Sequence, residues 1–327
     1  MPIGSQDMKL SIIIVSWNVK NDLLKCLSSL QKNQPFFSFE QIVVDNKSFD
    51  GTANIVKQEF PEVALIENQI NKGFAKANNQ GIRQSSGQYV LLLNPDTIVH
   101  PDSLDTLVGF LDNNPDVGAC GPKLLNADGT TQASVRQFPT FRGALYSHTI
   151  CRLIGLFRSQ YRKDRMKDFS YDRQTDVDQI MGAAMMVRRS VIDEVGLMDE
   201  NFFMYYEEID LCYRIKKAGR RIVFLPDAVI THLGGRSSSQ VPLKRVMMLK
   251  SLMAFFRNHR SKAAVGLFAV VFKAGVILRN ICHLIIGLFI LVIALASFNR
   301  KRRQKAAENI ALHAILLSKY LWQIITM

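Results

Sequence analysis

Residues 10–121 alternate between short apolar runs and segments in which apolar residues recur at helical spacing. The run Leu10–Val15 is apolar except at Ser11, which is typical of a strand buried on both faces of a sheet. The segment Asn21–Leu30 follows it and places four leucines on one helical face. Strands and helices that alternate along a chain form a mostly parallel sheet with helices packed on it. This pattern therefore predicts an α/β fold.

The pattern continues along the chain, and polar residues gather where the predicted strands end. Further strands are expected at Gln41–Asp45, Val63–Glu67, Tyr89–Asn94 and Val117–Gly121, with helices from Thr52, at Ala75–Gln84 and at Ser103–Asp112. The polar residues at the strand ends are Ser16, Asn18, Asp45, Asn46, Asn94 and Asp96. Ligands bind outside the carboxyl ends of the strands in open α/β sheets, so these are candidate binding residues. No GxGxxG or Walker sequence follows the first strand, which argues against a Rossmann dinucleotide site and a P-loop.

Positive charge is concentrated at the C-terminal end of the chain. Residues 1–235 contain 26 Lys and Arg against 27 Asp and Glu, whereas residues 236–327 contain 15 against one. The basic residues flank apolar sequence, because the 19 residues Asn280–Phe298 carry no charged side chain and a basic cluster follows them. An apolar segment of this length beside Lys and Arg predicts contact with an anionic membrane surface rather than with nucleic acid. The five cysteines are scattered and form no CxxC pair, which argues against a disulfide framework and a zinc site.

Six stretches of the sequence carry a family resemblance. They are SIIIVSWN, VVDNKSFDGT, NKGFAKANNQGI, LLLNPDTIV, RQFPT and MYYEEIDLCYRIKKAGRRIVFLPDAVITHLGG, and they occur in this order within residues 10–238. On these motifs the chain resembles the family 2 glycosyltransferases, in particular the bacterial rhamnosyltransferase-like branch. The resemblance implies a GT-A fold, a nucleotide-diphosphate sugar donor and a divalent metal cofactor, Mn²⁺ or Mg²⁺.

The resemblance also implies residues for the metal and the donor. Asp96 falls where the family has the second acid of its DxD metal motif, and Asn94 replaces the first acid. His232 matches the family histidine that reaches the metal or the diphosphate from the far side. The donor-binding residues are expected to be Ser16, Asn18, Asp45, Asn46, Asn71, Gly73, Asn94 and Arg136. Gly73 has the alternative of serving only a turn, and Arg136 that of a solvated surface charge.

The catalytic residues are expected in the acidic run Glu207, Glu208 and Asp210. The family has Glu-Asp-x-Asp here, and its base aligns with Glu208. An inverting transferase needs a carboxylate that takes the proton of the acceptor hydroxyl as that oxygen attacks the sugar. The acids also suit the N-terminus of a helix, where negative charge is favourable. We therefore expect Glu208 to be the base, with Glu207 and Asp210 supporting the helix start and the neighbouring backbone.

The apolar C-terminal region is expected to attach the protein to a membrane. Two apolar runs, Ala263–Leu278 and Ile281–Phe298, are separated by Arg279 and Asn280, and Ile310–Thr326 has the pattern of an amphipathic helix. A single span would put basic clusters on both sides of the bilayer, so a re-entrant hairpin or interfacial helices are favoured. The alternative is a helical surface for a soluble partner.

The expected organisation is a disordered leader at 1–9, a GT-A domain at 10–238 and a helical membrane-association region at 239–327. The resulting hypothesis is an inverting transferase on the cytoplasmic face of the bacterial inner membrane. It would add a sugar, with rhamnose expected, to a lipid-linked glycan acceptor in polysaccharide biosynthesis. The alternative is a catalytically impaired nucleotide-sugar-binding or scaffold protein of the same fold. The sequence leaves the oligomeric state open.

Overall fold

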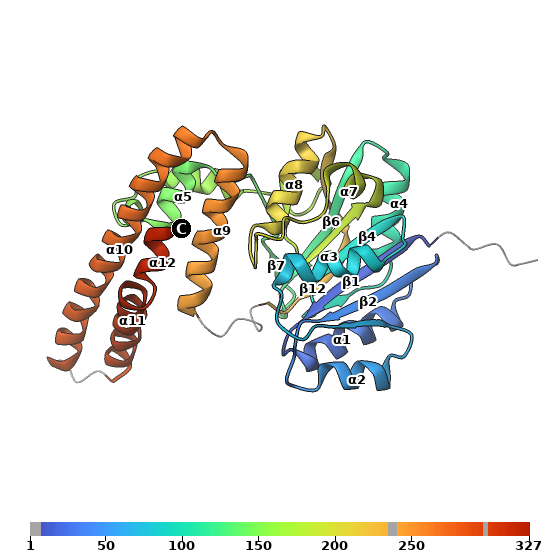
Figure 1. The fold of residues 1–327 in the computed structure, drawn as a ribbon, viewed down its shortest axis with the longest axis horizontal. Helices are drawn as coiled ribbons and strands as arrows, with labels where there is room; N and C mark the ends of the chain where they lie inside the picture. The colour runs from blue at the N-terminus through green and yellow to red at the C-terminus, as the bar shows by residue number, and fades with distance from the viewer. Residues whose placement is uncertain (1–7, 235–240, 297–299) are drawn as a thin grey trace, which may run out of the picture. The chain divides into compact units, whose positions relative to one another are not determined.

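The chain forms two compact units, seen in Figure 1. The structure, a computed structural model, describes residues 8–234, 241–296 and 300–327, so most of the predicted leader lies outside the described residues. The first unit comprises Met1–Phe138 and Asp168–Ser237, and the second comprises Pro139–Lys167 and Ser238–Met327. The second unit thus includes an internal segment that the sequence analysis assigned to the N-terminal domain.

A mixed, mostly parallel sheet forms the centre of the first unit. Its spatial order is β3 (Ala64–Glu67), β2 (Phe39–Asp45), β1 (Leu10–Ser16), β4 (Tyr89–Leu93), β11 (Ala184–Arg188), β6 (Val117–Leu125), β12 (Arg221–His232) and β5 (Thr97–Val99). The first four strands run parallel, and β12 runs parallel to β6. In contrast, β11 is antiparallel to β4 and β6, and β5 is antiparallel to β12. Short strands β7 (Thr131–Gln132) and β9 (Thr175–Asp176) extend the sheet, and β8 (Val135–Arg136) pairs with β10 (Gln179–Ile180).

Helices pack on the sheet because successive strand residues point to opposite faces. Ile12 and Ile14 of β1 join one buried core with the leucines of α1 (Lys20–Lys32) and α4 (Ser103–Asn113) and with Val56 of α2 (Thr52–Glu59). Ile13 faces the other way, toward α3 (Phe74–Gln84), where a Cβ at Gly81 would come within 2.5 Å of the Ile13 side chain. Helices α7 (Arg189–Val195) and α8 (Glu207–Lys217) follow β11 along the chain.

The structure confirms the strands and helices predicted for residues 10–121, with ends shifted by a few residues. Strands β5, β11 and β12 are not among the elements predicted from the sequence. Their pairing partners lie far away in the sequence, and they fall outside the regular alternation of strands and helices from which the other strands are predicted. Strand β12 brings the predicted metal ligand His232 to β5, where His232 pairs in register with Thr97, the residue after Asp96.

The second unit is helical. It contains α5 (Phe141–His148), a short 3-10 turn (Ile150–Arg152), α6 (Arg158–Asp164), α9 (Val241–His259), α10 (Lys262–Ala296), α11 (Arg300–Ser318) and α12 (Leu321–Thr326). Figure 1 shows α10 and α11 side by side as a helical hairpin. Phe141 of α5 packs its ring against Phe256 of α9 and Phe268 of α10, with ring centroids 4.6 and 4.4 Å apart. The internal segment therefore folds with the C-terminal helices.

The two apolar runs that Arg279 and Asn280 separate in the sequence lie in one helix, because α10 continues through both residues. Both polar side chains have partners inside the second unit. The Arg279 guanidinium donates to the Ser147 carbonyl at 2.7 Å, and the Asn280 amide donates to the Val276 carbonyl at 2.8 Å. By length and composition α10 is the one helix among the described residues that is apolar enough to cross a membrane, and only 17% of its most apolar window is buried. The predicted helix Ile310–Thr326 is divided, because α11 ends at Ser318 and α12 begins at Leu321.

Candidate active site

The carboxyl ends of β1 and β2 present two buried polar side chains without partners. Ser16 and Asp45 are paired in register at the strand ends and are 0% and 4% exposed. One oxygen of Asp45, Oδ2, accepts from the backbone N–H of Ser48 at 3.2 Å. The other oxygen, Oδ1, and the hydroxyl of Ser16 have no hydrogen-bond partner. Buried polar atoms are almost always satisfied, so this pair indicates a place where a polar ligand binds.

The asparagines predicted for the donor site organise the loops around these strand ends. Asn46 donates to Asn71 Oδ1 at 2.9 Å and to the Gly73 carbonyl at 3.2 Å, and its own Oδ1 accepts from Lys72 N. Asn18, in the left-handed region at φ 54°, accepts from the Phe49 N–H at 2.7 Å. These contacts fix two neighbouring loops. Asn18, Asn46 and Asn71 therefore shape the rim of the site through its backbone.

Gly73 joins the donor side of the site to the segment before the acidic run. Its φ of +84° lies in the left-handed region, and a Cβ there would come within 2.5 Å of the Phe203 carbonyl oxygen. The adjacent Phe74 N–H donates to the same oxygen at 2.7 Å. Only glycine combines this backbone conformation with this close approach. The glycine is thus required for packing, as well as for the turn.

Asp96 and His232 lie together, as the predicted metal site requires. His232 Nε2 is 3.3 Å from Asp96 Oδ1 and 3.4 Å from Asn94 Nδ2, and both Asp96 and His232 are less than 10% exposed. The side chain of Gln132 fixes the orientation of the His232 ring on its Nδ1 side. It donates to the His232 carbonyl at 3.2 Å and to Asn126 Oδ1 at 2.8 Å, so its own Oε1, 2.7 Å from Nδ1, is the acceptor. Nδ1 then carries the proton, and Nε2 presents a lone pair to Asp96.

This arrangement fits a divalent metal held by few protein ligands. A lone pair on Nε2 facing a carboxylate oxygen at 3.3 Å is favourable only when a proton or a cation lies between the two atoms. Mg²⁺ is usually bound by one or two carboxylates, with the remaining ligands from substrate phosphates and water. Within residues 8–234, 241–296 and 300–327, no group of three or more His, Cys, Asp or Glu could hold a metal alone. A diphosphate would therefore complete the coordination.

Glu207, which is buried, and Glu208, which is partly exposed, form a carboxylate pair at the start of α8. Each has one oxygen, Oε2, that is buried and has no hydrogen-bond partner. Burial and the charge on Glu208 raise the pKa of Glu207 well above its usual range. Burial also raises the pKa of Glu208, but backbone N–H groups at the helix start and the charge of Arg136 oppose that rise. Glu207 therefore keeps its proton more readily, and Glu208 is the better candidate for the ionised base.

Arg136 acts on the carboxylate pair, whereas Asp210 ties α8 to a neighbouring loop. The charge of Arg136 lowers the pKa of Glu208, so Arg136 lies near the carboxylate pair. Asp210 is 1% exposed, and its Oδ2 accepts from Arg214 Nε at 2.8 Å. Arg214 also donates to the carbonyls of Val195, Gly196 and Leu197, so the pair ties α8 to the loop after α7. This geometry favours a structural role for Asp210.

Four residues near the site are not among the predicted site residues. Gln132 orients His232 but lies in a two-residue strand with no motif around it. Gly182 lies against Glu208, because a Cβ there would come within 3.3 Å of the Glu208 Cβ. Tyr205 and Tyr206 both have positive φ, at 72° and 73°, immediately before the carboxylate pair. Strained backbone of this kind clusters at functional sites, and two successive residues in this conformation fix where α8 begins.

Comparisons with known proteins identify the family of this chain. The model of the family "Glycosyl transferase family 2" matches residues 11–196. The N-acetylglucosaminyl-diphospho-decaprenol L-rhamnosyltransferase of Mycobacterium tuberculosis is 32% identical over 219 residues, which are 62% of this chain and 68% of that protein. Rhamnosyltransferase WbbL of Escherichia coli is 29% identical over 225 residues, 66% of this chain and 80% of that protein.

Solved structures show the same fold. The mannosyltransferase PcManGT from Pyrobaculum calidifontis, in complex with GDP-Man and Mn²⁺, matches with a TM-score of 0.55 at 16% identity, over 97% of this chain and 88% of that chain. GalNAc-T7 with UDP, GalNAc and Mn²⁺ matches with a TM-score of 0.56 at 17% identity, over 77% of this chain and 48% of that chain. The predicted GT-A fold is confirmed.

Proposed function

Since this chain belongs to the family 2 glycosyltransferases, we propose that it is an inverting enzyme that transfers a sugar from a nucleotide diphosphate to a lipid-linked acceptor. Two relatives are named rhamnosyltransferases, which supports rhamnose as the sugar. One relative's name specifies a diphospho-decaprenol substrate, which supports a lipid-linked diphosphate as the acceptor. The exposed apolar helix α10 supports work at a membrane surface, and we place the enzyme on the cytoplasmic face of the bacterial inner membrane.

The observation that carries the proposal is the set of buried polar atoms without partners. Among the described residues seven side-chain atoms are of this kind, and four of them belong to Ser16, Asp45, Glu207 and Glu208. A ligand that placed hydroxyl groups at both ends of the site would satisfy them. A nucleotide sugar with an acceptor hydroxyl has this chemistry. Ser16 and Asp45 would bind the nucleoside, and the carboxylate pair would bind the reacting hydroxyl.

The mechanism follows from the protonation of the carboxylate pair. Glu208, ionised beside Arg136, takes the proton of the acceptor hydroxyl while that oxygen attacks the anomeric carbon from the face opposite the leaving diphosphate. Glu207 keeps its own proton and so does not repel the ionised Glu208. Asp96 and His232, with Asn94 alongside, would hold a divalent metal that neutralises charge on the departing diphosphate. Gln132 keeps His232 in the tautomer that this role requires.

Sugar transfer by the purified full-length protein tests this proposal. Nucleotide-diphosphate sugars that differ in the sugar are tested as donors in the presence of Mn²⁺. The acceptor is a lipid-linked diphosphate that carries one sugar. Transfer should require the metal, stop with chelator and fail to recover in Asp96→Ala. Full transfer in chelator would show that the metal assignment of Asp96 and His232 is wrong. Donor binding without transfer to any acceptor would favour a binding or scaffold protein instead.

A further inference from the structure

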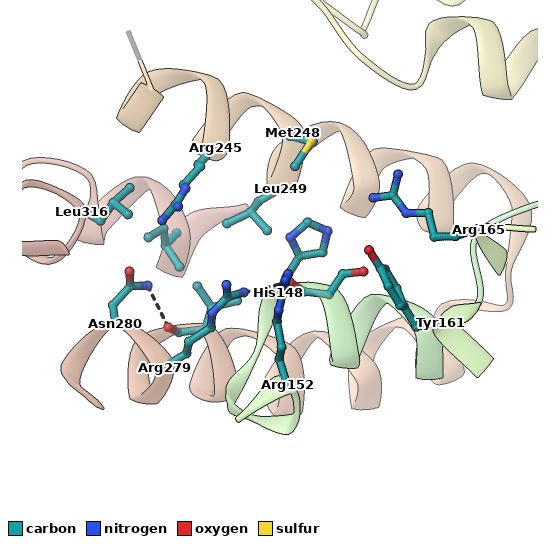
Figure 2. A pocket seen from close by; sticks show the side chains of 13 residues that line it. His148, Arg152, Tyr161, Arg165, Arg245, Met248, Leu249, Arg279, Asn280 and Leu316 are labelled. Carbon is teal, nitrogen blue, oxygen red and sulfur yellow. Dashed lines mark hydrogen bonds between the residues drawn. The ribbon is translucent and has the colours of Figure 1, made fainter. Parts of the chain in front are cut away.

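The second unit contains a cationic cavity whose lining residues are not part of the candidate active site. It has a volume of about 220 Å³ and is lined from α5 through α12. Its polar residues include Arg152, Arg165, Arg245 and Arg279, together with His148. Figure 2 shows Arg245 extending from α9, with Arg279 of α10 and Arg152 on the opposite side. Each side chain comes from a different element, so only the folded unit brings the charges together.

No acidic residue lines the cavity to balance these charges. In the part of the chain that the structure describes, no salt bridge joins any of the four arginines to a carboxylate. The pKa of His148 is lowered to about 3, first by burial and then by the charges of Arg279, Arg165, Arg152 and Arg245. Partly buried like charges repel one another, and an anion bound between them would remove that repulsion.

The lining also contains apolar side chains. Met248, Leu249, Val276, Leu316 and Ile324 share the cavity with the arginines. A free anion gains nothing from such neighbours, whereas an anion that continues into a hydrocarbon chain does. Large hydrophobic residues are also exposed outside the cavity, along α10 and at Leu153, Ile154 and Leu156, directly after Arg152 in the sequence. The combination favours a lipid as the source of the anion.

We propose that this cavity binds the diphosphate group of the lipid-linked acceptor, with Arg152, Arg245 and Arg279 as its anion-binding residues. The guanidinium fork matches phosphate oxygens, and a cavity of about 220 Å³ is smaller than the usual range of about 300–1,000 Å³ for ligand pockets. It therefore suits a phosphate head group rather than a whole nucleotide sugar. This inference rests on the proposed function, because it assigns the acceptor that the function requires.

Binding of farnesyl diphosphate to the full-length protein in detergent, without any donor, tests the cavity directly. Arg245→Gln and Arg279→Gln should each weaken binding by about 10-fold or more, because each removes a charge-assisted hydrogen bond. Arg257→Gln is the matched control, since Arg257 lies exposed on α9 and does not line the cavity. Arg245→Lys keeps the charge and should recover part of the affinity. Thermal unfolding of each variant checks that the fold is intact.

Arg152→Gln provides a second test that does not depend on a half-buried side chain. Arg152 is exposed, and its matched control is Arg158→Gln on the neighbouring helix α6. Flotation with phosphatidylglycerol vesicles should change equally in a cavity variant and its control, because each loses one positive charge. Only the cavity variants should lose affinity for farnesyl diphosphate. Equal affinity in Arg245→Gln and Arg257→Gln would overturn the proposal.

The remaining outcomes separate this inference from the proposed function. Inorganic diphosphate that binds as tightly as farnesyl diphosphate would assign the cavity to a soluble anion and overturn the lipid assignment. Sugar transfer with an unchanged acceptor KM in Arg245→Gln and Arg279→Gln would overturn the cavity and leave the function intact. Arginine-dependent binding of farnesyl diphosphate in a protein that transfers no sugar would support the cavity and contradict the function alone.

Discussion

The carboxylate pair at the start of α8 makes opposite predictions for two adjacent substitutions. Glu208→Gln removes the proposed base but keeps its size, so turnover should fall by about 10²–10⁴-fold. This loss corresponds to about 2.7–5.4 kcal/mol of transition-state stabilisation. Glu207→Gln should keep turnover within about 10-fold, because an amide resembles the protonated carboxyl that the raised pKa of Glu207 favours.

The structure also indicates that neither substitution should disturb the fold. Oε2 of Glu207 and of Glu208 has no hydrogen-bond partner, so the amide group breaks no bond made by that oxygen. Asp210→Asn is the contrasting variant, because it replaces the buried ionic partner of Arg214 and should cost about 1–3 kcal/mol of stability. Its loss of activity should therefore accompany a lower melting temperature, whereas that of Glu208→Gln should not.

The assay is transfer of radiolabelled sugar, with kcat and the KM of donor and acceptor determined separately. For Glu208→Gln we expect a lower kcat with little change in the donor KM. In the wild type, kcat/KM should fall at low pH with an apparent pKa above the ordinary value for glutamate, since burial raises the pKa of Glu208. Equal losses in Glu207→Gln and Glu208→Gln would refute the division of roles. Loss in Asp210→Asn at unchanged stability, with full activity in Glu208→Gln, would move the base to Asp210.

Three further predictions concern the support of the site. Gln132→Ala should weaken Mn²⁺ activation by about 10–100-fold, because His232 loses the acceptor at Nδ1, and Gln132→Glu should restore most of it; an unchanged Mn²⁺ titration would contradict this. Gly73→Ala should lower the free energy of unfolding, measured in urea, by more than about 1 kcal/mol. Gly51→Ala is the control and should cost less, because Gly51 also has a positive φ but a Cβ there would meet nothing within 4 Å. Glu207 binds its proton more tightly in the folded protein than in the unfolded chain. The wild type should therefore lose stability as the pH rises from about 4.3, the ordinary pKa of glutamate, toward the raised pKa of Glu207. Glu207→Gln should lose less stability over that pH range.

The sequence determined the parts of this protein that depend on local pattern. The alternation of apolar runs with helical spacing predicts β1, β2, β4 and their helices, because strand and helix periodicities are set by neighbouring residues. The same reasoning places Ser16 and Asp45 at the carboxyl edge of the sheet, where the structure brings them into register. The family motifs likewise identified Asp96 and His232, which lie within 3.3 Å of each other although 136 positions separate them.

Only the tertiary structure decided the roles that depend on long-range contacts. The sequence shows three acids in one run, but the ion pair with Arg214 and the charge of Arg136 separate Asp210 from Glu208. The boundary predicted at residue 238 leaves residues 139–167 in the first domain, whereas they fold with the helical unit. Their contacts with α9 and α10 depend on the packing of aromatic rings, which composition does not reveal. In the sequence, Arg279 separates two apolar runs. In the folded unit α10 passes through it unbroken, and its side chain joins a cationic cavity whose other charges come from distant helices.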